Sequence, residues 1–99
     1  MAGDPIGALG RCRERIDELD RRLVDLLNER TSIVEEIARL KKEADLAIYE
    51  PKLEVQVFEN IVTHNRGPLP AESLRGIFER IIDEMRRIQK DRMQKETES

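Results

Sequence analysis

Hydrophobic residues recur in alternating steps of three and four along the first part of the chain, as they do on one face of a long helix. We call this stripe the seam, and its positions are Leu9, Cys12, Ile16, Leu19, Leu23, Leu26, Arg30, Ile33, Ile37 and Leu40. Because neither proline nor glycine occurs between Arg11 and Pro51, the pattern predicts one helix from about Ala8 to Glu43. Such a helix is roughly 50 Å long. A 99-residue monomer has no room to bury a seam of that length, so we expect a partner chain.

Two shorter helices follow. Pro51 suits the first position of a helix, and Gly67 with Pro68 suits its end. The third helix begins near Pro70, and its apolar face comprises Leu74, Ile77, Phe78, Ile81, Ile82, Met85 and Ile88. The sequence therefore predicts an all-α fold with helices of about 36, 15 and 21 residues. We expect a flexible N-terminus over 1–7, a helical domain over 8–91 and a polar tail over 92–99.

Composition narrows the function. Charged residues make up 39% of the chain and aromatic residues 3%, which suits long helices with charged outer faces. The net charge is −3 with acids and bases interleaved, so nucleic acid is not an expected partner. No apolar run approaches the roughly 20 residues that cross a bilayer, and no signal peptide is evident. The single cysteine, Cys12, allows no disulfide within the chain and favours a reducing cytoplasm.

Several polar residues fall where the helices are otherwise apolar. Arg30 occupies a seam position. There it either forms a buried ion pair or sets the register of an oligomer, or it binds an anion. Lys41 lies on the flank of the seam, roughly 16 Å from Arg30 along the axis. Arg13, on the same flank, lies roughly 25 Å from Arg30, too far for one pocket within one chain. An antiparallel second chain would bring its Arg13 within reach, and together these cations predict a cavity for a small polyanion.

Two further polar side chains extend the apolar faces of the shorter helices. Glu54 opens the second helix and Gln89 continues the face of the third, although a plain interhelical hydrogen bond would also explain either one. The sequence has no metal-ligand cluster, no glycine-rich phosphate loop and no evident nucleophile–base pair. Any catalysis would therefore work by charge and shape, without a metal or other cofactor.

These residues lie within motifs of a known family. The segments "LGRCRERIDELDRRLVDLLNER", "IARLKKE", "IYEPKLE" and "GPLPAESLRGIFERIIDEMRRIQ" occur in order and with matching spacing, so the chain resembles the all-helical (AroQ-type) chorismate mutases from about Leu9 to Gln89. The resemblance implies an intertwined homodimer of three-helix protomers with two sites, each shared between the chains. It also implies the intramolecular Claisen rearrangement of chorismate to prephenate, a step in phenylalanine and tyrosine synthesis.

The resemblance assigns roles to the cations. Arg13 of the partner subunit and Arg30 look like the clamps on the two substrate carboxylates, with Arg30 also counted as catalytic. Lys41 matches the lysine at the ether oxygen, where negative charge builds as the C–O bond breaks. Gln89 matches the second hydrogen-bond donor to that oxygen. Fixed donors in a dry cavity can hold the reactive shape and stabilise that charge without a covalent intermediate.

Acidic residues and two departures complete the comparison. Glu54 matches the acid that binds the ring hydroxyl of the substrate. Glu50 falls where the family often has Asp beside that hydroxyl. Leu53 stands where the family commonly has Arg, and Met85 stands where a small polar residue lines the site. Loss of one auxiliary cation costs about 1.5–3 kcal/mol by analogy with charged hydrogen bonds. That corresponds to roughly ten- to over a hundredfold in rate, so the sequence predicts an active but slow mutase.

Three alternatives remain open. The chain could be a regulatory domain that binds chorismate or prephenate without fast turnover, an option that Leu53 and Met85 favour. It could be an isochorismate–pyruvate lyase with a similar site, or a structural helical bundle. The sequence also leaves open whether this domain is free-standing or is fused to, or associated with, another enzyme of the aromatic pathway, and whether it is under feedback control.

Overall fold

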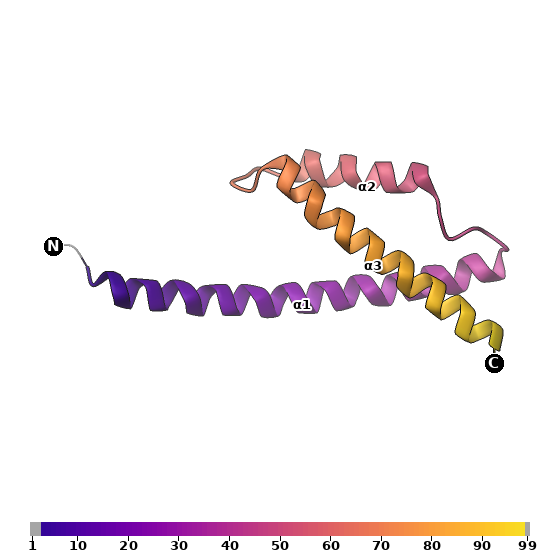
Figure 1. Cartoon of the computed structure of the whole chain (residues 1–99), viewed down its shortest axis with the longest axis horizontal. Helices are drawn as coiled ribbons and strands as arrows, with labels where there is room; N and C mark the ends of the chain where they lie inside the picture. The colour runs from indigo at the N-terminus through magenta and orange to yellow at the C-terminus, as the bar shows by residue number, and fades with distance from the viewer. Residues whose placement is uncertain (1–2, 99) are drawn as a thin grey trace. The chain divides into compact units, whose positions relative to one another are not determined.

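Three helices make up the chain over residues 3–98, the part that the computed structural model describes, and no strand occurs within those residues. Helix α1 spans Pro5–Glu43, α2 spans Pro51–His64 and α3 spans Ala71–Glu98 (Figure 1). Side chains are described as far as residue 94. The all-α prediction is confirmed for this part of the chain.

Helix α1 ends at Glu43 as predicted but begins at Pro5 instead of Ala8. The reason is local, because the Asp4 carboxylate accepts a hydrogen bond from the Ile6 N–H at 3.2 Å. Pro5 takes the first helical position, where a missing N–H costs nothing. The helix thus includes part of the segment 1–7 that we expected to be flexible, while residues 1–2 of that segment lie outside the described residues.

The two later helices differ from prediction at their ends. Helix α2 begins at Pro51 as predicted, but its C-cap is Asn65, whose N–H bonds to the carbonyls at 61 and 62, so Gly67 is not the cap. Helix α3 has 28 residues, longer than predicted, because no proline or glycine follows Gly76 and the polar tail is rich in strong helix formers. The boundary between a domain over 8–91 and a tail over 92–99 stays a prediction, and residue 99 is not described.

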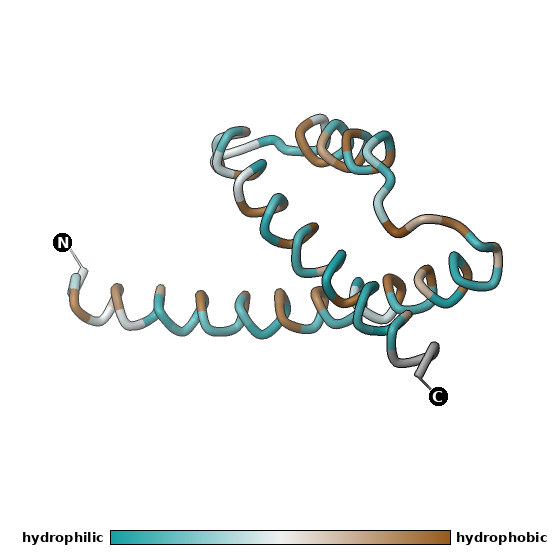
Figure 2. Tube along the Cα trace, turned by 45° about the vertical axis from the view of Figure 1, so that its right-hand side comes forward, coloured by the Kyte–Doolittle hydropathy of each residue, from teal (hydrophilic) through white to brown (hydrophobic). Residues whose placement is uncertain are grey.

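The chain divides into two units, Met1–Ser32 and Ile33–Ser99, and each is described by itself. In the first unit, hydrophobic residues recur turn after turn along α1 (Figure 2), and those of the seam are exposed. In the second unit, α2 and α3 are joined by a short loop and pack against each other with opposite directions (Figure 1). The buried residues of the second unit come from the end of α1 and the middle of α3, namely Val34, Ala38, Ile82 and Met85.

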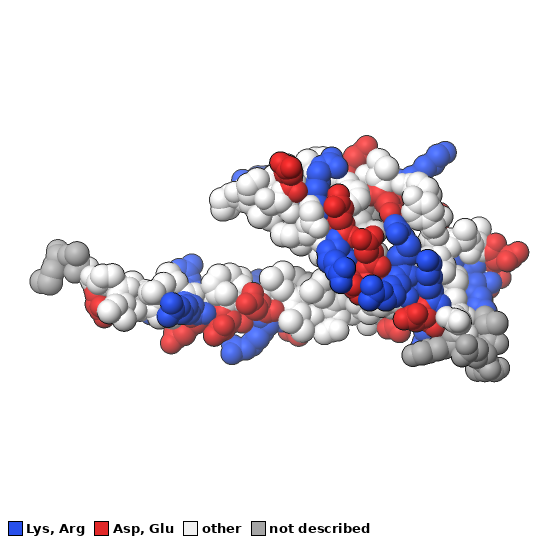
Figure 3. Space-filling view, in the orientation of Figure 1, with Lys and Arg blue, Asp and Glu red and all other residues white. Residues whose placement is uncertain are grey.

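Charged side chains of both signs cover the outer face of α3. Figure 3 shows them interleaved along the helix, and several form ion pairs one turn apart, such as Arg80 with Glu84 at 2.8 Å. Exposed pairs of this kind contribute little to stability, but they keep the helix surface hydrated. Among the described residues, no helix has the length and apolarity required to span a membrane.

Candidate functional site

Lys41 is held at the end of α1 by the segment that links α1 to α2. Its ammonium lies 2.9 Å from the Glu50 carboxylate and donates to the Ile48 carbonyl at 3.0 Å, and its side chain is only 12% exposed. The chain can fold back in this way because Asp45 adopts a left-handed backbone conformation with φ of 57° and the Leu46 N–H bonds to the Lys41 carbonyl at 2.7 Å. The structure therefore brings together two of the predicted site residues, Lys41 and Glu50.

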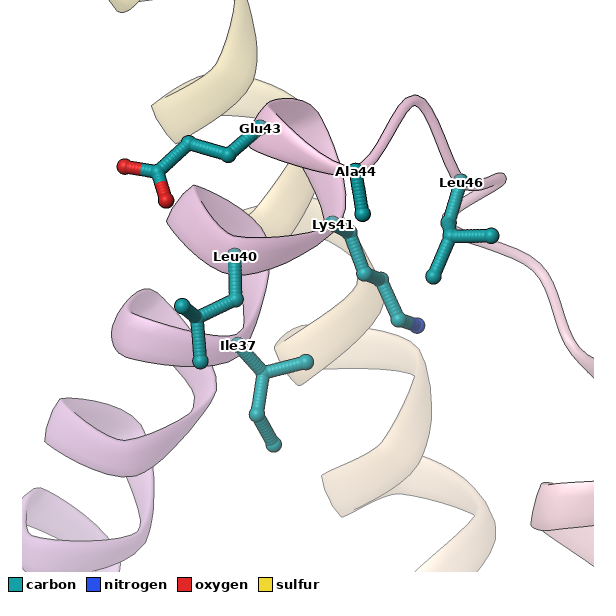
Figure 4. Close-up of a pocket in the computed structure, with 6 residues that line it drawn as sticks. All are labelled: Ile37, Leu40, Lys41, Glu43, Ala44 and Leu46. Carbon is teal, nitrogen blue, oxygen red and sulfur yellow. The ribbon is translucent and has the colours of Figure 1, made fainter.

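An open hollow of about 470 Å³ lies beside this lysine. Its lining consists of Ile37, Leu40, Lys41, Glu43, Ala44 and Leu46. In Figure 4 the Lys41 side chain extends between Ile37 and Leu46, whereas the Glu43 carboxylate points the opposite way. The hollow thus presents one cation among mainly apolar side chains. The ammonium is already paired with Glu50 and the Ile48 carbonyl, and its third N–H can be donated to a negatively charged or electron-rich group.

Glu54 is engaged by a residue that the sequence analysis did not single out. One terminal nitrogen of Arg86, on α3, lies 2.6 Å from both carboxylate oxygens of Glu54, on α2. The Arg86 guanidinium also lies over the Tyr49 ring, 4.9 Å from its centroid. The hydrogen bond with Glu54 raises the pKa of Arg86 above its ordinary value, against a smaller opposing effect of desolvation. The side chain of Arg86 thus links α3 to α2 and to the preceding linker.

Arg86 was missed although the sequence carries a signal for it. It directly follows Met85 and lies four residues after Ile82, so it lies at the edge of the apolar face of α3. The same reasoning selected Lys41 at the edge of the seam. The acidic partner of Arg86 could not be identified in this way, because Glu54 lies 32 residues away on another helix.

Gln89 and Met85 lie close together on α3 but in different environments. Met85 is 7% exposed and belongs to the core of the second unit. Gln89 is half-buried, and its side-chain oxygen is buried without a hydrogen-bond partner among the described residues. An unsatisfied amide oxygen has a free-energy cost that a ligand or a bound water could offset. Gln89 is therefore a polar group available for binding, and no hydrogen bond joins it to Lys41.

Arg13 and Arg30 belong to the first unit, whereas Lys41, Glu50, Glu54 and Gln89 belong to the second. Arg13 is exposed and Arg30 is half-buried. Within the part of the chain that is described, no acidic residue forms an ion pair with either arginine. Arg30 occupies a seam position as the sequence indicated, but the flanking Leu26 and Ile33 are 59% and 57% exposed, so a single chain does not bury the seam there. The clamp role of both arginines stays a prediction.

No group of three or more histidine, cysteine, aspartate or glutamate residues within 3–98 is arranged to hold a metal ion. The site residues described above are cations, carboxylates and one amide. Such a set can bind a small anion, orient hydroxyl and carboxylate groups, and donate hydrogen bonds to an oxygen that gains charge.

Comparisons with known proteins agree with this chemistry. The family described as chorismate mutase type II matches residues 12–90. A bifunctional chorismate mutase/prephenate dehydratase from Stutzerimonas stutzeri is 37% identical over 75 residues, which cover 71% of this chain and 20% of the relative. The chain thus spans about a fifth of the length of that curated relative.

Solved structures also resemble this chain. Chorismate mutase (form II) from Thermus thermophilus has a TM-score of 0.80 at 33% identity, covering 88% of this chain and 96% of its own. Chorismate mutase from Helicobacter pylori in complex with prephenate has a TM-score of 0.82 at 31% identity, covering 89% and 96%. The similarity therefore extends over nearly all of the described fold.

Proposed function

The chain belongs to the chorismate mutase type II family, and from this premise we propose that it rearranges chorismate to prephenate. The observation that carries the proposal is that the family match over residues 12–90 includes every proposed site residue. These residues run from Arg13 on α1 to Gln89 on α3. The reaction is intramolecular, so the protein needs to bind one small dianion in a compact shape and to stabilise charge at its ether oxygen.

Lys41 is the proposed donor to the ether oxygen. Its ammonium has three N–H donors and uses two of them on the Glu50 carboxylate and the Ile48 carbonyl. One donor therefore remains for substrate, and the two protein contacts hold the ammonium in place before the substrate binds. The side-chain amide nitrogen of Gln89 is the proposed second donor to the ether oxygen, since the amide oxygen can only accept. Glu54 and Glu50 are the proposed partners of the substrate hydroxyl.

Arg30 and Arg13 of the partner subunit are the proposed carboxylate clamps, which requires a homodimer. The exposed seam supports this part of the proposal. In a single chain the leucines and isoleucines of the seam are between 38% and 59% exposed. Burying the rest of each side chain would contribute about 1 kcal/mol, or roughly half the value for burying a whole leucine. A second copy has the same seam and can cover this one along its length.

The proposal also covers the wider setting of this domain. The match occupies only 20% of the bifunctional relative, so an attached or associated enzyme of the aromatic pathway is part of the proposal. A regulatory domain without fast turnover is the alternative that Leu53 supports, because this residue is 49% exposed on α2 and cannot donate a hydrogen bond. We place the protein in the cytoplasm, in keeping with its single cysteine.

One assay tests the function. Purified protein is mixed with chorismate, the loss of ultraviolet absorbance is followed, and the product is identified by NMR. We expect prephenate to form well above the uncatalysed rate. Tight binding of chorismate without turnover would identify a regulatory domain instead, and release of pyruvate from isochorismate in a parallel sample would identify a lyase. Arg30→Ala is expected to abolish turnover, and sedimentation should detect a dimer.

A further inference from the structure

We propose that Arg86 is a positioning residue for Glu54, and that it supplies from α3 the positive charge that Leu53 lacks on α2. This inference rests on the proposed function, in which Glu54 binds the hydroxyl of chorismate. Arg86 itself has no role in the mechanism proposed above. Two properties of Arg86 carry it, namely its contacts with Glu54 and its effect on the charge balance of the site.

The contacts of Arg86 fix the Glu54 carboxylate between two helices. One terminal nitrogen of Arg86 lies 2.6 Å from each of the two oxygens of Glu54, and the side chains are 28% and 27% exposed. The Arg86 guanidinium also lies over the Tyr49 ring, with its central carbon 4.9 Å from the ring centroid. Without Arg86, the Glu54 carboxylate would have no other described partner to define its orientation. The observed contacts therefore determine where Glu54 presents its oxygens.

This arrangement leaves Glu54 able to bind a hydroxyl. Each carboxylate oxygen has about two lone pairs, and the contact with Arg86 occupies one on each oxygen. One lone pair per oxygen remains for the hydroxyl proton of the substrate. Glu54 can therefore be paired with Arg86 and bind substrate at the same time.

Charge balance gives Arg86 a second effect on binding. Chorismate carries two carboxylates, so an uncompensated glutamate beside its hydroxyl would repel it. The guanidinium of Arg86 offsets that charge at 2.6 Å, and the other carboxylate that it pairs with, that of the more exposed Asp83, lies farther away at 3.7 Å. Removal of Arg86 should therefore weaken binding of the dianion more than it slows the chemical step, because Lys41 and Gln89, the proposed donors at the ether oxygen, are unchanged.

The position of Arg86 explains how it can serve in place of an arginine at 53. Leu53 precedes Glu54 on α2 and is 49% exposed. Because its side chain is a hydrocarbon, it has neither a charge nor a hydrogen-bond donor. Arg86 reaches the Glu54 carboxylate from the facing helix and so brings a positive charge to this part of the site. It lies three residues before Gln89, which places both on one side of α3. The alternative is that the pair only ties α2 to α3 and has no effect on substrate.

Steady-state kinetics of Arg86→Met with chorismate separate these possibilities. Methionine keeps much of the length of the side chain without its charge. We expect KM to rise about tenfold to a hundredfold with a smaller fall in kcat. Arg87→Met is the matched control, since Arg87 is the next residue of α3, is 65% exposed and pairs with Glu84 at 3.5 Å. It should leave both constants unchanged.

Two further variants connect the effect to Glu54 and to position 53. In a Glu54→Gln background, Arg86→Met should change KM little, because no negative charge remains to be positioned or cancelled. Adding Leu53→Arg to Arg86→Met should restore much of the lost affinity. Arg86→Lys keeps the charge in a different shape, and we expect a severalfold rise in KM in the native chain and none in the Glu54→Gln background. That variant decides the matter even if Arg86→Met lowers stability.

The results that would overturn the inference are specific. Equal kinetics for Arg86→Met and Arg87→Met would show that Arg86 serves the fold alone. An equally large rise in KM with Glu54→Gln present would show that Arg86 does not act through Glu54. Both results require an active native chain, so they are distinct from failure of the proposed function, in which the native chain itself leaves chorismate unconverted.

Discussion

Replacement of Lys41 by methionine gives the sharpest test of the proposed mechanism. The variant keeps most of the apolar stem of the side chain but removes the ammonium. The Lys41 side chain is only 12% exposed and its ammonium has two protein acceptors, at 2.9 and 3.0 Å, so its position is well defined. Loss of one preorganised donor at a developing oxyanion typically costs about 2.7–4 kcal/mol, or roughly a hundred- to a thousandfold in kcat.

The effect of this variant on folding should be much smaller. Glu50, the acidic partner of Lys41, is 38% exposed and can be rehydrated by water when the lysine is removed. We therefore expect a loss of about 1 kcal/mol or less in the free energy of unfolding, as for other partly exposed ion pairs. The structure thus predicts a chain that is folded and nearly inactive.

Initial rates with saturating chorismate measure kcat, and urea denaturation followed by circular dichroism measures the free energy of unfolding. Lys42→Met is the control, because Lys42 is the next residue of α1 and is also half-buried, and its ammonium donates to the Met93 carbonyl at 3.4 Å. The control should retain most of the native kcat. A folded Lys41→Met variant that keeps more than about a tenth of the native kcat would refute the role of Lys41 at the ether oxygen.

Three further predictions concern the shared site, the departure at 53 and the core. Inactive Arg13→Ala and Lys41→Met chains, when mixed and reassociated, should recover about a quarter of native activity, because half of the dimers are mixed and each mixed dimer has one intact site; no recovery would place both residues in the same chain's site. Leu53→Arg alone should raise kcat/KM by about threefold or less, because Arg86 already pairs with Glu54, and steady-state kinetics showing a much larger gain would contradict that compensation. Ile82→Ala should lower the free energy of unfolding by about 2–4 kcal/mol, since Ile82 is one of the few buried side chains of the second unit; a loss below about 1 kcal/mol in urea denaturation would be inconsistent with a core at this position.

The fold was largely predictable because its signals are local. The spacing of the seam predicts a helix over most of α1, and Pro51 identifies the start of α2. The errors were also local in origin. Asp4 and Pro5 start α1 early, Asn65 caps α2 in place of Gly67, and good helix-forming residues extend α3 to Glu98. Each of these follows from hydrogen bonds or helix propensities within a few residues, which the period of the apolar pattern does not report.

The candidate site was predictable only residue by residue. A polar side chain at or beside an apolar face identifies Arg30, Lys41, Glu54 and Gln89 as unusual, because such positions are normally hydrophobic. The pattern does not reveal what each side chain contacts. It did not predict that Lys41 is held by Glu50 and the Ile48 carbonyl.

The amino-acid sequence thus determined which residues share a face of each helix. The tertiary structure determined which side chain each of them contacts. The clearest example is the pair of Glu54 and Arg86, which lie 32 residues apart in sequence and 2.6 Å apart in space. Periodicity reports which side of its own helix a residue occupies. It carries no information about which side of another helix will face it, because that depends on how the loop at residues 65–70 turns α3 back against α2.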